Sequence, residues 1–139
     1  MIEKLKDWLK SHTLWRLAIR PTLRVQLEQL NTAKPTVFYL GLPEHGNLGD
    51  QAIAKATEIY LQEQLPQHQV VRIANDAVLP CIPLLKRIMQ PNHLIVMHGG
   101  GNLGDLWPGA ESVRRAVVNR LKKWPIIQLP QSVFLIDKQ

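Results

Sequence analysis

Short apolar runs alternate with helix-patterned segments along most of this chain, and that alternation constrains its fold more than any other feature. The runs are rich in β-branched residues and show no regular polar alternation, as expected of strands covered on both faces. They lie at residues 36–42, 69–74, 93–98 and 125–132. Strands that alternate with helices form right-handed βαβ crossovers. The sequence therefore predicts an α/β protein with a Rossmann-like, mainly parallel sheet of about four strands flanked by helices.

The segments between these strands carry helical spacing of unequal strength. A stripe of apolar residues predicts a helix over 50–64, and an apolar face predicts another over 110–123. The stripe consists of Ala52, Ile53, Ala56, Ile59 and Tyr60, and the face of Val113, Val117, Leu121 and Trp124. Pro80 and Pro83 interrupt the remaining crossover. Because proline removes a backbone donor, only a short or irregular helix around 83–90 is expected there.

A helical segment precedes the first strand. Apolar positions at three- and four-residue spacing predict helices over 3–19 and 22–31, with Pro21 suited to the first position of the second helix. With 139 residues the chain is long enough for one ordinary domain. We therefore divide it into an N-terminal amphipathic helical segment, 1–34, and a Rossmann-like domain, 35–139.

Basic residues gather in the N-terminal segment. The chain has a formal net charge of +6, and residues 1–35 hold seven lysines and arginines against three acidic residues. Two interpretations stay open. We favour a helix that packs on the domain through its apolar stripe over one in which residues 1–31 lie on an anionic membrane surface. Basic residues elsewhere are scattered and no recognition motif accompanies them, so no nucleic-acid partner is expected.

The composition predicts a protein of the cytoplasm, with a peripheral position at the inner membrane face as the open alternative. The N-terminus carries charges every few residues and lacks the apolar core of a secretory signal. No stretch reaches the roughly 18 to 20 apolar residues of a membrane span. Cys81 is the single cysteine, which excludes an internal disulfide, and its apolar neighbours predict a small core residue.

The five letters GNLGD occur twice, at 46–50 and at 101–105, and each copy follows a predicted strand. His45 and His98 stand just upstream of the two copies. In open parallel sheets, ligands bind beyond the carboxyl ends of the strands, which is where both copies lie. The strand order 2-1-3-4 would bring the two loops to one crevice, whereas 3-2-1-4 would separate them.

The second copy is extended upstream, so that residues 99–101 are all glycine. Without Cβ atoms, the backbone amides of 99–102 can approach a ligand closely, and a following helix N-terminus attracts anions. A phosphate or a carboxylate is the expected ligand. Asp105, farther from its helix, is a candidate catalytic group. His98 is a candidate acid because imidazole titrates near neutral pH, although a structural role stays open.

The first copy is expected to suit hydroxyl groups better than anions. Asp50 opens the following helix, where a carboxylate caps backbone amides and competes with an anion for the same positive end. Asn47 and Asn102 either contact a ligand or hold left-handed backbone. His45 is a candidate acid–base group with the same structural alternative as His98.

Spacing argues against several other sites. Gly99, Gly101 and Gly104 satisfy G-x-G-x-x-G, but no helix follows directly and the strand at 125–132 has no carboxylate for a ribose. No pair of histidine or acidic residues falls at i, i+4 beside the loops, so no metal is expected. The chain also lacks a serine nucleophile elbow and a P-loop lysine.

Three segments together resemble the N-terminal part of the polysaccharide pyruvyl transferase family: HGNLGDQAI after the first strand, HGGGNLGDLW after a later one, and PIIQLPQS at the last. The resemblance covers about residues 36–133. It implies the N-terminal half of a transferase with two Rossmann-like domains, similar to GT-B glycosyltransferases. It also implies transfer of the enolpyruvyl group of phosphoenolpyruvate, a substrate rather than a cofactor, to a sugar of an exopolysaccharide or cell-wall glycan precursor, free or lipid-linked.

The resemblance and the chemistry of the loops together give two sets of candidate site residues. The catalytic set is Asp105, which the resemblance carries over with the second motif, and His98, which is the candidate acid named above. The substrate-binding set is Gly46, Asn47, Gly49, Asp50, Gly99, Gly100, Gly101, Asn102, Gln131 and Ser132.

The chain departs from the family in length. Members are considerably longer, and their second domain is expected to supply much of the phosphoenolpyruvate site. The resemblance therefore implies a truncated, incomplete enzyme. Two other functions stay open, namely a glycosyltransferase-like domain that binds a nucleotide sugar, and a non-catalytic remnant that docks on a membrane through its basic N-terminal helix.

Overall fold

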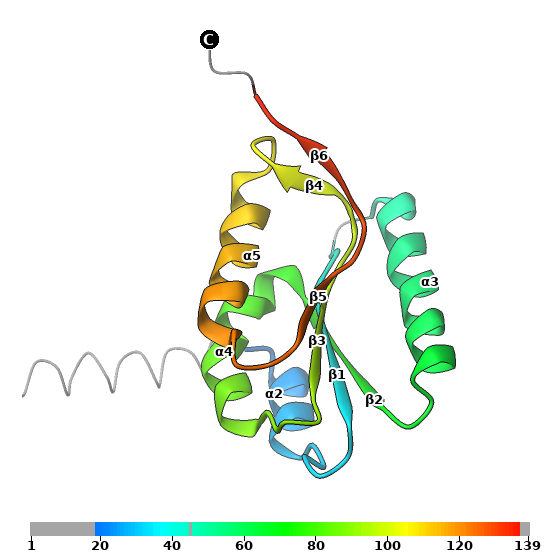
Figure 1. The fold of residues 1–139 in the computed structure, drawn as a ribbon, viewed down its shortest axis with the longest axis vertical. Helices are drawn as coiled ribbons and strands as arrows, with labels where there is room; N and C mark the ends of the chain where they lie inside the picture. Colours follow the sequence, from blue (N-terminus) through cyan, green and yellow to red (C-terminus); the bar gives the residue numbers. More distant parts are fainter. Residues whose placement is uncertain (1–18, 45, 137–139) are drawn as a thin grey trace, which may run out of the picture.

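The structure, a computed structural model, describes residues 19–44 and 46–136 (Figure 1). The predicted helix over 3–19 and His45 therefore lie outside the described residues, apart from Ile19. The elements in chain order are α2 (Pro21–Glu28), β1 (Thr36–Leu42), α3 (Leu48–Gln64), β2 (Gln69–Ala74), α4 (Asn75–Ile88), β3 (Leu94–Met97), β4 (Gly100–Gly104), α5 (Pro108–Leu121), β5 (Ile126–Gln128) and β6 (Gln131–Phe134). The predicted α/β class is confirmed.

The main sheet has four parallel strands in the order β2-β1-β3-β5. Val37 of β1 pairs with Val70 on one side and with Leu94 on the other, so β1 lies in the interior of the sheet. This order confirms the 2-1-3-4 alternative and excludes 3-2-1-4. The strands that precede the two GNLGD copies are therefore neighbours.

Helices cover the two faces of this sheet unequally. Figure 1 shows α2, α4 and α5 on one face and α3 on the other. Alternate residues of β1 supply both cores, because Phe38 and Leu40 pack with α4 and α5 while Val37 and Tyr39 pack beneath α3. All four side chains are buried, as the unbroken apolar run of β1 predicted.

The proline-containing crossover forms a longer helix than the sequence predicted. The short helix expected around 83–90 is instead α4, fourteen residues with Pro80 and Pro83 inside it. An interior proline costs about 3 kcal/mol of helix stability. That cost is offset by the apolar face of α4, since each buried aliphatic side chain contributes about 1.5–3 kcal/mol. The buried residues are Ala77, Val78, Cys81, Ile82 and Leu85.

The apolar stripe that predicted α3 faces solvent. Ile53, Ile59 and Tyr60 are 40–57% exposed, whereas Ala54 and Leu61 are the buried residues of the helix. The period of the stripe indicated a helix correctly, but the packed face is the opposite one. By contrast, α5 packs as predicted, with Val117 and Leu121 buried and Val113 and Trp124 against the same core.

A second, two-stranded sheet replaces the expected glycine loop. Residues 100–104 form β4, which pairs in parallel with β6. The predicted strand over 125–132 accordingly divides into β5 and β6, because Pro130 follows the end of β5 and the chain leaves the main sheet there. Figure 1 shows the β4–β6 pair extending beyond the carboxyl edge of the main sheet. In the described part of the chain, no helix is long and apolar enough to cross a membrane.

Candidate functional site

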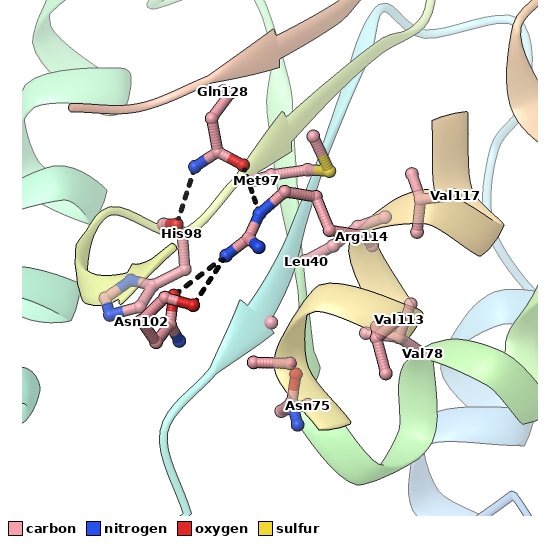
Figure 2. A pocket seen from close by; sticks show the side chains of 12 residues that line it. Leu40, Asn75, Val78, Met97, His98, Asn102, Val113, Arg114, Val117 and Gln128 are labelled. Atoms are coloured by element: carbon pink, nitrogen blue, oxygen red, sulfur yellow. Dashed lines mark hydrogen bonds between the residues drawn. The ribbon is translucent and has the colours of Figure 1, made fainter. Parts of the chain in front are cut away.

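A cleft opens at the carboxyl ends of β1, β3 and β5, between the first turns of α4 and α5 (Figure 2). It encloses about 340 Å³ of empty space, part of which is open to solvent. Aliphatic residues and Met97 form much of its wall, and its polar residues are Asn75, His98, Asn102, Arg114 and Gln128. An apolar cleft with a few convergent polar groups at this sheet edge is the usual form of a small-molecule site in such folds.

Arg114 of α5 is the central polar side chain of the cleft. Its side chain is only 13% exposed. Its Nε donates to Gln128 Oε1 at 3.1 Å and its Nη2 to Asn102 Oδ1 at 2.8 Å (Figure 2). Its Nη1 pairs with Glu111 at 2.5 Å. The guanidinium thus joins α5 to β4 and β5 and is neutralised by Glu111. Hydrogen bonds from Arg115 and then Arg114 hold the pKa of Glu111 below its usual value.

Two glutamines fix the backbone of His98. The Nε2 atoms of Gln128 and Gln131 donate to the His98 carbonyl oxygen at 3.0 and 2.7 Å. Gln131 also accepts the Asn102 amide through Oε1 at 3.3 Å. The predicted residue Gln131 therefore joins β6 to the second GNLGD copy through contacts within the protein.

The imidazole of His98 lies beneath α3. Its Nδ1 is 2.6 Å from the Tyr39 hydroxyl oxygen, and the side chains of both residues are buried. Burial lowers the pKa of His98, opposed by the nearby Asp50 charge, so the ring is neutral at pH 7. Burial also raises the pKa of Tyr39, which keeps its phenol protonated. The Nε2 atom of His98 is buried and has no hydrogen-bond partner among the described residues.

The first GNLGD copy begins α3, but Asp50 is not its N-cap. Asn47 holds that position, with φ −68° and its side chain accepting the Gly49 amide at 3.0 Å. Asp50 lies within the first turn, and a Cβ on Gly100 would lie 3.8 Å from its Oδ1. The two copies therefore meet at the sheet edge, as the order 2-1-3-4 predicted. Gly46 is exposed, and a Cβ there would meet nothing within 4 Å.

The left-handed alternative for the two asparagines is wrong, since no non-glycine residue in the described ranges has positive φ. Asn47 is instead a helix cap and Asn102 a strand residue, because their side chains find partners in Gly49 and Arg114. Positive φ occurs at Gly100 (132°) in the predicted glycine run.

The open anion cradle expected at residues 99–102 is not formed. The Gly100 amide donates to Pro130 O and the Asn102 amide to Gln131 Oε1, because this segment pairs with β6 rather than turning into a helix. A Cβ on Gly99 would approach Pro130 O to 2.7 Å, so its small size serves this contact. Gly101 is exposed and a Cβ there would meet nothing within 4 Å.

Asp105 and Ser132 lie away from His98. Asp105 follows the far end of β4, where its Oδ2 accepts the Ile136 amide at 3.1 Å. Ser132 is an exposed residue of β6. Of the predicted site residues, the structure thus brings together His98, Asp50, Gly99, Gly100, Asn102 and Gln131. In residues 19–44 and 46–136, no three histidine, cysteine, aspartate or glutamate side chains cluster as metal ligands.

Four residues of this edge were not predicted as site residues: Tyr39, Asn75, Arg114 and Gln128. Gln128 gave a local signal, since it is a polar residue within an apolar strand. Tyr39 and Arg114 gave none, because a tyrosine in a buried strand and an arginine on a helix are ordinary. Cys81 is buried in the α4 core as predicted, and burial raises its pKa to about 12.

The chain is similar to known proteins over most of its length. The chain is 37% identical over 115 residues to general stress protein 30 of Bacillus subtilis (strain 168), covering 83% of this chain and 34% of that protein. It is 34% identical over 106 residues to pyruvyl transferase 1 of Schizosaccharomyces pombe, covering 74% of this chain and 26% of that protein. The chain thus spans about a third or less of the length of these curated relatives.

The polysaccharide pyruvyl transferase family matches residues 47–139. This range includes Asp50 of the first GNLGD copy and His98, which precedes the second copy. The matched segment runs from α3 through β6 and contains the second glycine motif and Gln131. The chain belongs to the polysaccharide pyruvyl transferase family.

Proposed function

We propose that the chain takes part in transferring a pyruvyl group from phosphoenolpyruvate to a sugar of an exopolysaccharide or cell-wall glycan precursor. The observation that carries this proposal is the fixed position of His98, held by Tyr39 and two glutamines where the two GNLGD copies meet. A side chain held this firmly, with one ring nitrogen unused, is typical of a group that contacts substrate. Family membership supplies the reaction class.

The proposed reaction converts an enol phosphate into a ketal. The methylene carbon of phosphoenolpyruvate gains a proton, and the neighbouring carbon becomes oxocarbenium-like. Two sugar hydroxyl oxygens bond to that carbon, and its bond to the phosphate oxygen breaks. Of the two protons lost by the hydroxyls, one balances the proton gained by carbon and the other leaves with phosphate. Such a site needs an acid, groups that orient hydroxyls, and donors for the departing phosphate.

His98 and Asp50 suit the hydroxyl side of this reaction. A neutral imidazole hydrogen-bonds a hydroxyl, and a carboxylate accepts a hydroxyl proton in a hydrogen bond while repelling an anion. The Asp50 charge lies close enough to His98 to affect its pKa. The roles of His98 as the proton donor to carbon and of Asp105 as a catalytic group stay predictions, and the lowered pKa of His98 makes its protonated form rarer at pH 7.

The groups that bind the departing phosphate are proposed to come from a site that this chain shares with further protein. The curated relatives are about three to four times as long as the segment they share with this chain. We propose that further protein supplies the phosphate-binding donors, since Glu111 already neutralises Arg114. On this proposal the described sheet edge forms the sugar-binding half of a cleft and is an incomplete enzyme by itself.

The test of this proposal is an assay that measures ketal formation directly. The chain, alone and mixed with the portion of general stress protein 30 that lies beyond the match, is incubated with phosphoenolpyruvate and methyl glycosides that carry free 1,2- or 1,3-diols. Phosphate release and the mass of a pyruvate ketal are measured. We expect both in the mixture, and a strong reduction with His98→Ala but not with Tyr60→Phe. Uridine diphosphate sugars replace phosphoenolpyruvate in a parallel series.

Ketal formation unaffected by His98→Ala would remove the role proposed for this edge. Glycosyl transfer or calorimetric binding of the nucleotide sugar, without ketal formation, would favour the glycosyltransferase-like alternative. A mixture that is inactive with both donors, while each protein is folded by circular dichroism, would contradict the shared site.

We also propose that a lipid-linked acceptor places the protein at the inner membrane face, supported by the basic residues of the N-terminal segment. Flotation with vesicles containing phosphatidylglycerol tests this. Binding should be lost on removal of residues 1–18. It should also weaken as salt is added, because the Debye length falls to about 10 Å at 0.1 M ionic strength and charges farther apart are screened. Unchanged flotation after the removal would contradict this placement.

A further inference from the structure

Almost every polar atom of His98 has a partner within the protein. Its amide donates to Leu40 O at 2.9 Å, and its carbonyl accepts from Gln128 and Gln131. Its Nδ1 contacts the Tyr39 hydroxyl. Only Nε2 is buried without a partner among the described residues. An unpaired buried polar group costs about 1–3 kcal/mol of folding free energy. Because the other polar atoms of His98 are hydrogen-bonded, the unpaired Nε2 atom indicates a group that binds a ligand.

The protonation of the Tyr39 hydroxyl indicates which atom donates in the Tyr39–His98 contact. Burial raises the pKa of the phenol, so it carries its hydrogen at pH 7. The hydrogen bond that this hydroxyl forms with Nδ1 of His98 spans 2.6 Å. A buried hydroxyl hydrogen without an acceptor costs about 1–3 kcal/mol, so Tyr39 donates to Nδ1 of His98.

We infer that Tyr39 is a positioning residue that holds neutral His98 with its proton on Nε2. A neutral imidazole whose Nδ1 accepts a hydrogen bond must carry its hydrogen on Nε2. His98 then presents a donor, not a base, to whatever enters beneath α3, and the complementary ligand atom is an oxygen acceptor. The use of this donor on a sugar or on phosphoenolpyruvate rests on the proposed function, but the position of the proton does not.

Nitrogen-15 NMR of the histidine side chains tests the inference on the chain as it exists, without substrate. The pattern of couplings from the ring carbon protons distinguishes the two neutral tautomers. At pH 7.5 we expect the Nε2–H pattern for His98. His93 is an internal reference, since its Nδ1 accepts the Gln90 amide and its Nε2 is 3.0 Å from Thr32 O, which fixes the same tautomer by backbone contacts.

Two matched variants separate Tyr39 from a general effect of losing a phenol. Tyr39→Phe should give His98 the averaged nitrogen shifts of exchanging tautomers and leave His93 unchanged. Tyr60→Phe removes the hydroxyl of the other tyrosine, which is 57% exposed on α3, and should change neither histidine. A role of Tyr39 in packing alone would leave the His98 pattern as in the wild type.

An Nδ1–H pattern for His98 in the wild-type chain would overturn the inference, and so would an unchanged pattern in folded Tyr39→Phe. If Tyr39→Phe fails to fold, incorporation of 3-fluorotyrosine replaces it. The more acidic fluorophenol should shift the Nδ1 resonance of His98 and not that of His93, and an unshifted Nδ1 would contradict donation by Tyr39. None of these readouts depends on ketal formation, so this inference and the proposed function can fail separately.

Discussion

Arg114 Nη2 donates a 2.8 Å hydrogen bond to Asn102 Oδ1, and through it α5 is joined to the second GNLGD copy. The same guanidinium holds Gln128, which in turn donates to the carbonyl of His98. The position of His98 is therefore coupled to a helix residue with which it forms no direct hydrogen bond. Substitutions on α5 should consequently alter the sheet edge.

Replacing Arg114 by methionine should destabilise the chain by about 1–3 kcal/mol, because the amide oxygens of Asn102 and Gln128 lose buried donors. Denaturant unfolding measures the change. Arg115→Met is the matched control, since Arg115 is 75% exposed and, within residues 19–44 and 46–136, forms a salt bridge with Glu111 alone. Its cost should stay within about 0.5 kcal/mol. Equal costs for the two variants would contradict a structural role of the Arg114 contacts.

Gly104→Ala should disrupt the β4–β6 pair while leaving the main sheet folded. Gly104 has φ 107°, and a Cβ there would lie 1.9 Å from Phe134 O. Backbone strain of this kind costs about 1–3 kcal/mol. Hydrogen exchange should show lost protection at the Asp105 amide, which donates to Phe134 O. Gly101→Ala, where a Cβ meets nothing within 4 Å, should retain protection, and loss in both variants would point to a general weakness of this pair.

Acidification should destabilise the chain partly through His98. Its pKa is lowered in the folded state by burial, so the folded protein binds this proton less readily than the unfolded chain. The contribution of His98 to stability is therefore complete above the unfolded value of about 6.5 and is lost as pH falls through the folded value. Urea unfolding between pH 7.5 and 5 should show a smaller loss in His98→Gln than in the wild type. Identical pH dependence would contradict a lowered pKa.

Cys81 should resist thiol reagents while the chain is folded. Its side chain is fully buried, and burial raises its pKa to about 12, so the reactive thiolate is scarce at pH 8. Labelling with iodoacetamide should be slow in buffer and fast in denaturant. Ser112→Cys in a Cys81→Ala background places the thiol at an exposed position of α5 and should react quickly without denaturant. Rapid labelling of native Cys81 would indicate that the α4 core opens easily.

Local patterns predicted the strands more accurately than they predicted what lies between them. The bounds of β1 and β2 agree with the apolar runs because a strand buried on both faces leaves an unbroken signal. The order of the strands could not be decided, since both orders satisfy the same local pattern. In α4, the proline signal was outweighed by tertiary packing of the helix against the sheet. In β4, a distant partner strand determined the conformation of residues that local rules assign to a loop.

The site shows the same division between local and distant information. His98 and the glycines could be located because strand ends and glycine runs are visible in the sequence. Arg114 could not, because it stands next to Arg115 on the same helix and is the same residue type, yet 13% of one side chain and 75% of the other is exposed. Only the placement of α5 against β4 and β5 distinguishes them.

The repeated pentapeptide has a consequence for how variation in this family is compared. Gly49 is a helical residue whose added Cβ would meet only the Asn47 amide oxygen at 3.3 Å, whereas Gly104 ends a strand with positive φ. We therefore expect substitution to be tolerated more readily at Gly49 than at Gly104. In relatives, substitutions should accumulate at the position of Gly49 well before they do so at the position of Gly104. An alignment that superposes the two copies as equivalent repeats would average these two evolutionary rates and hide the constraint on the second.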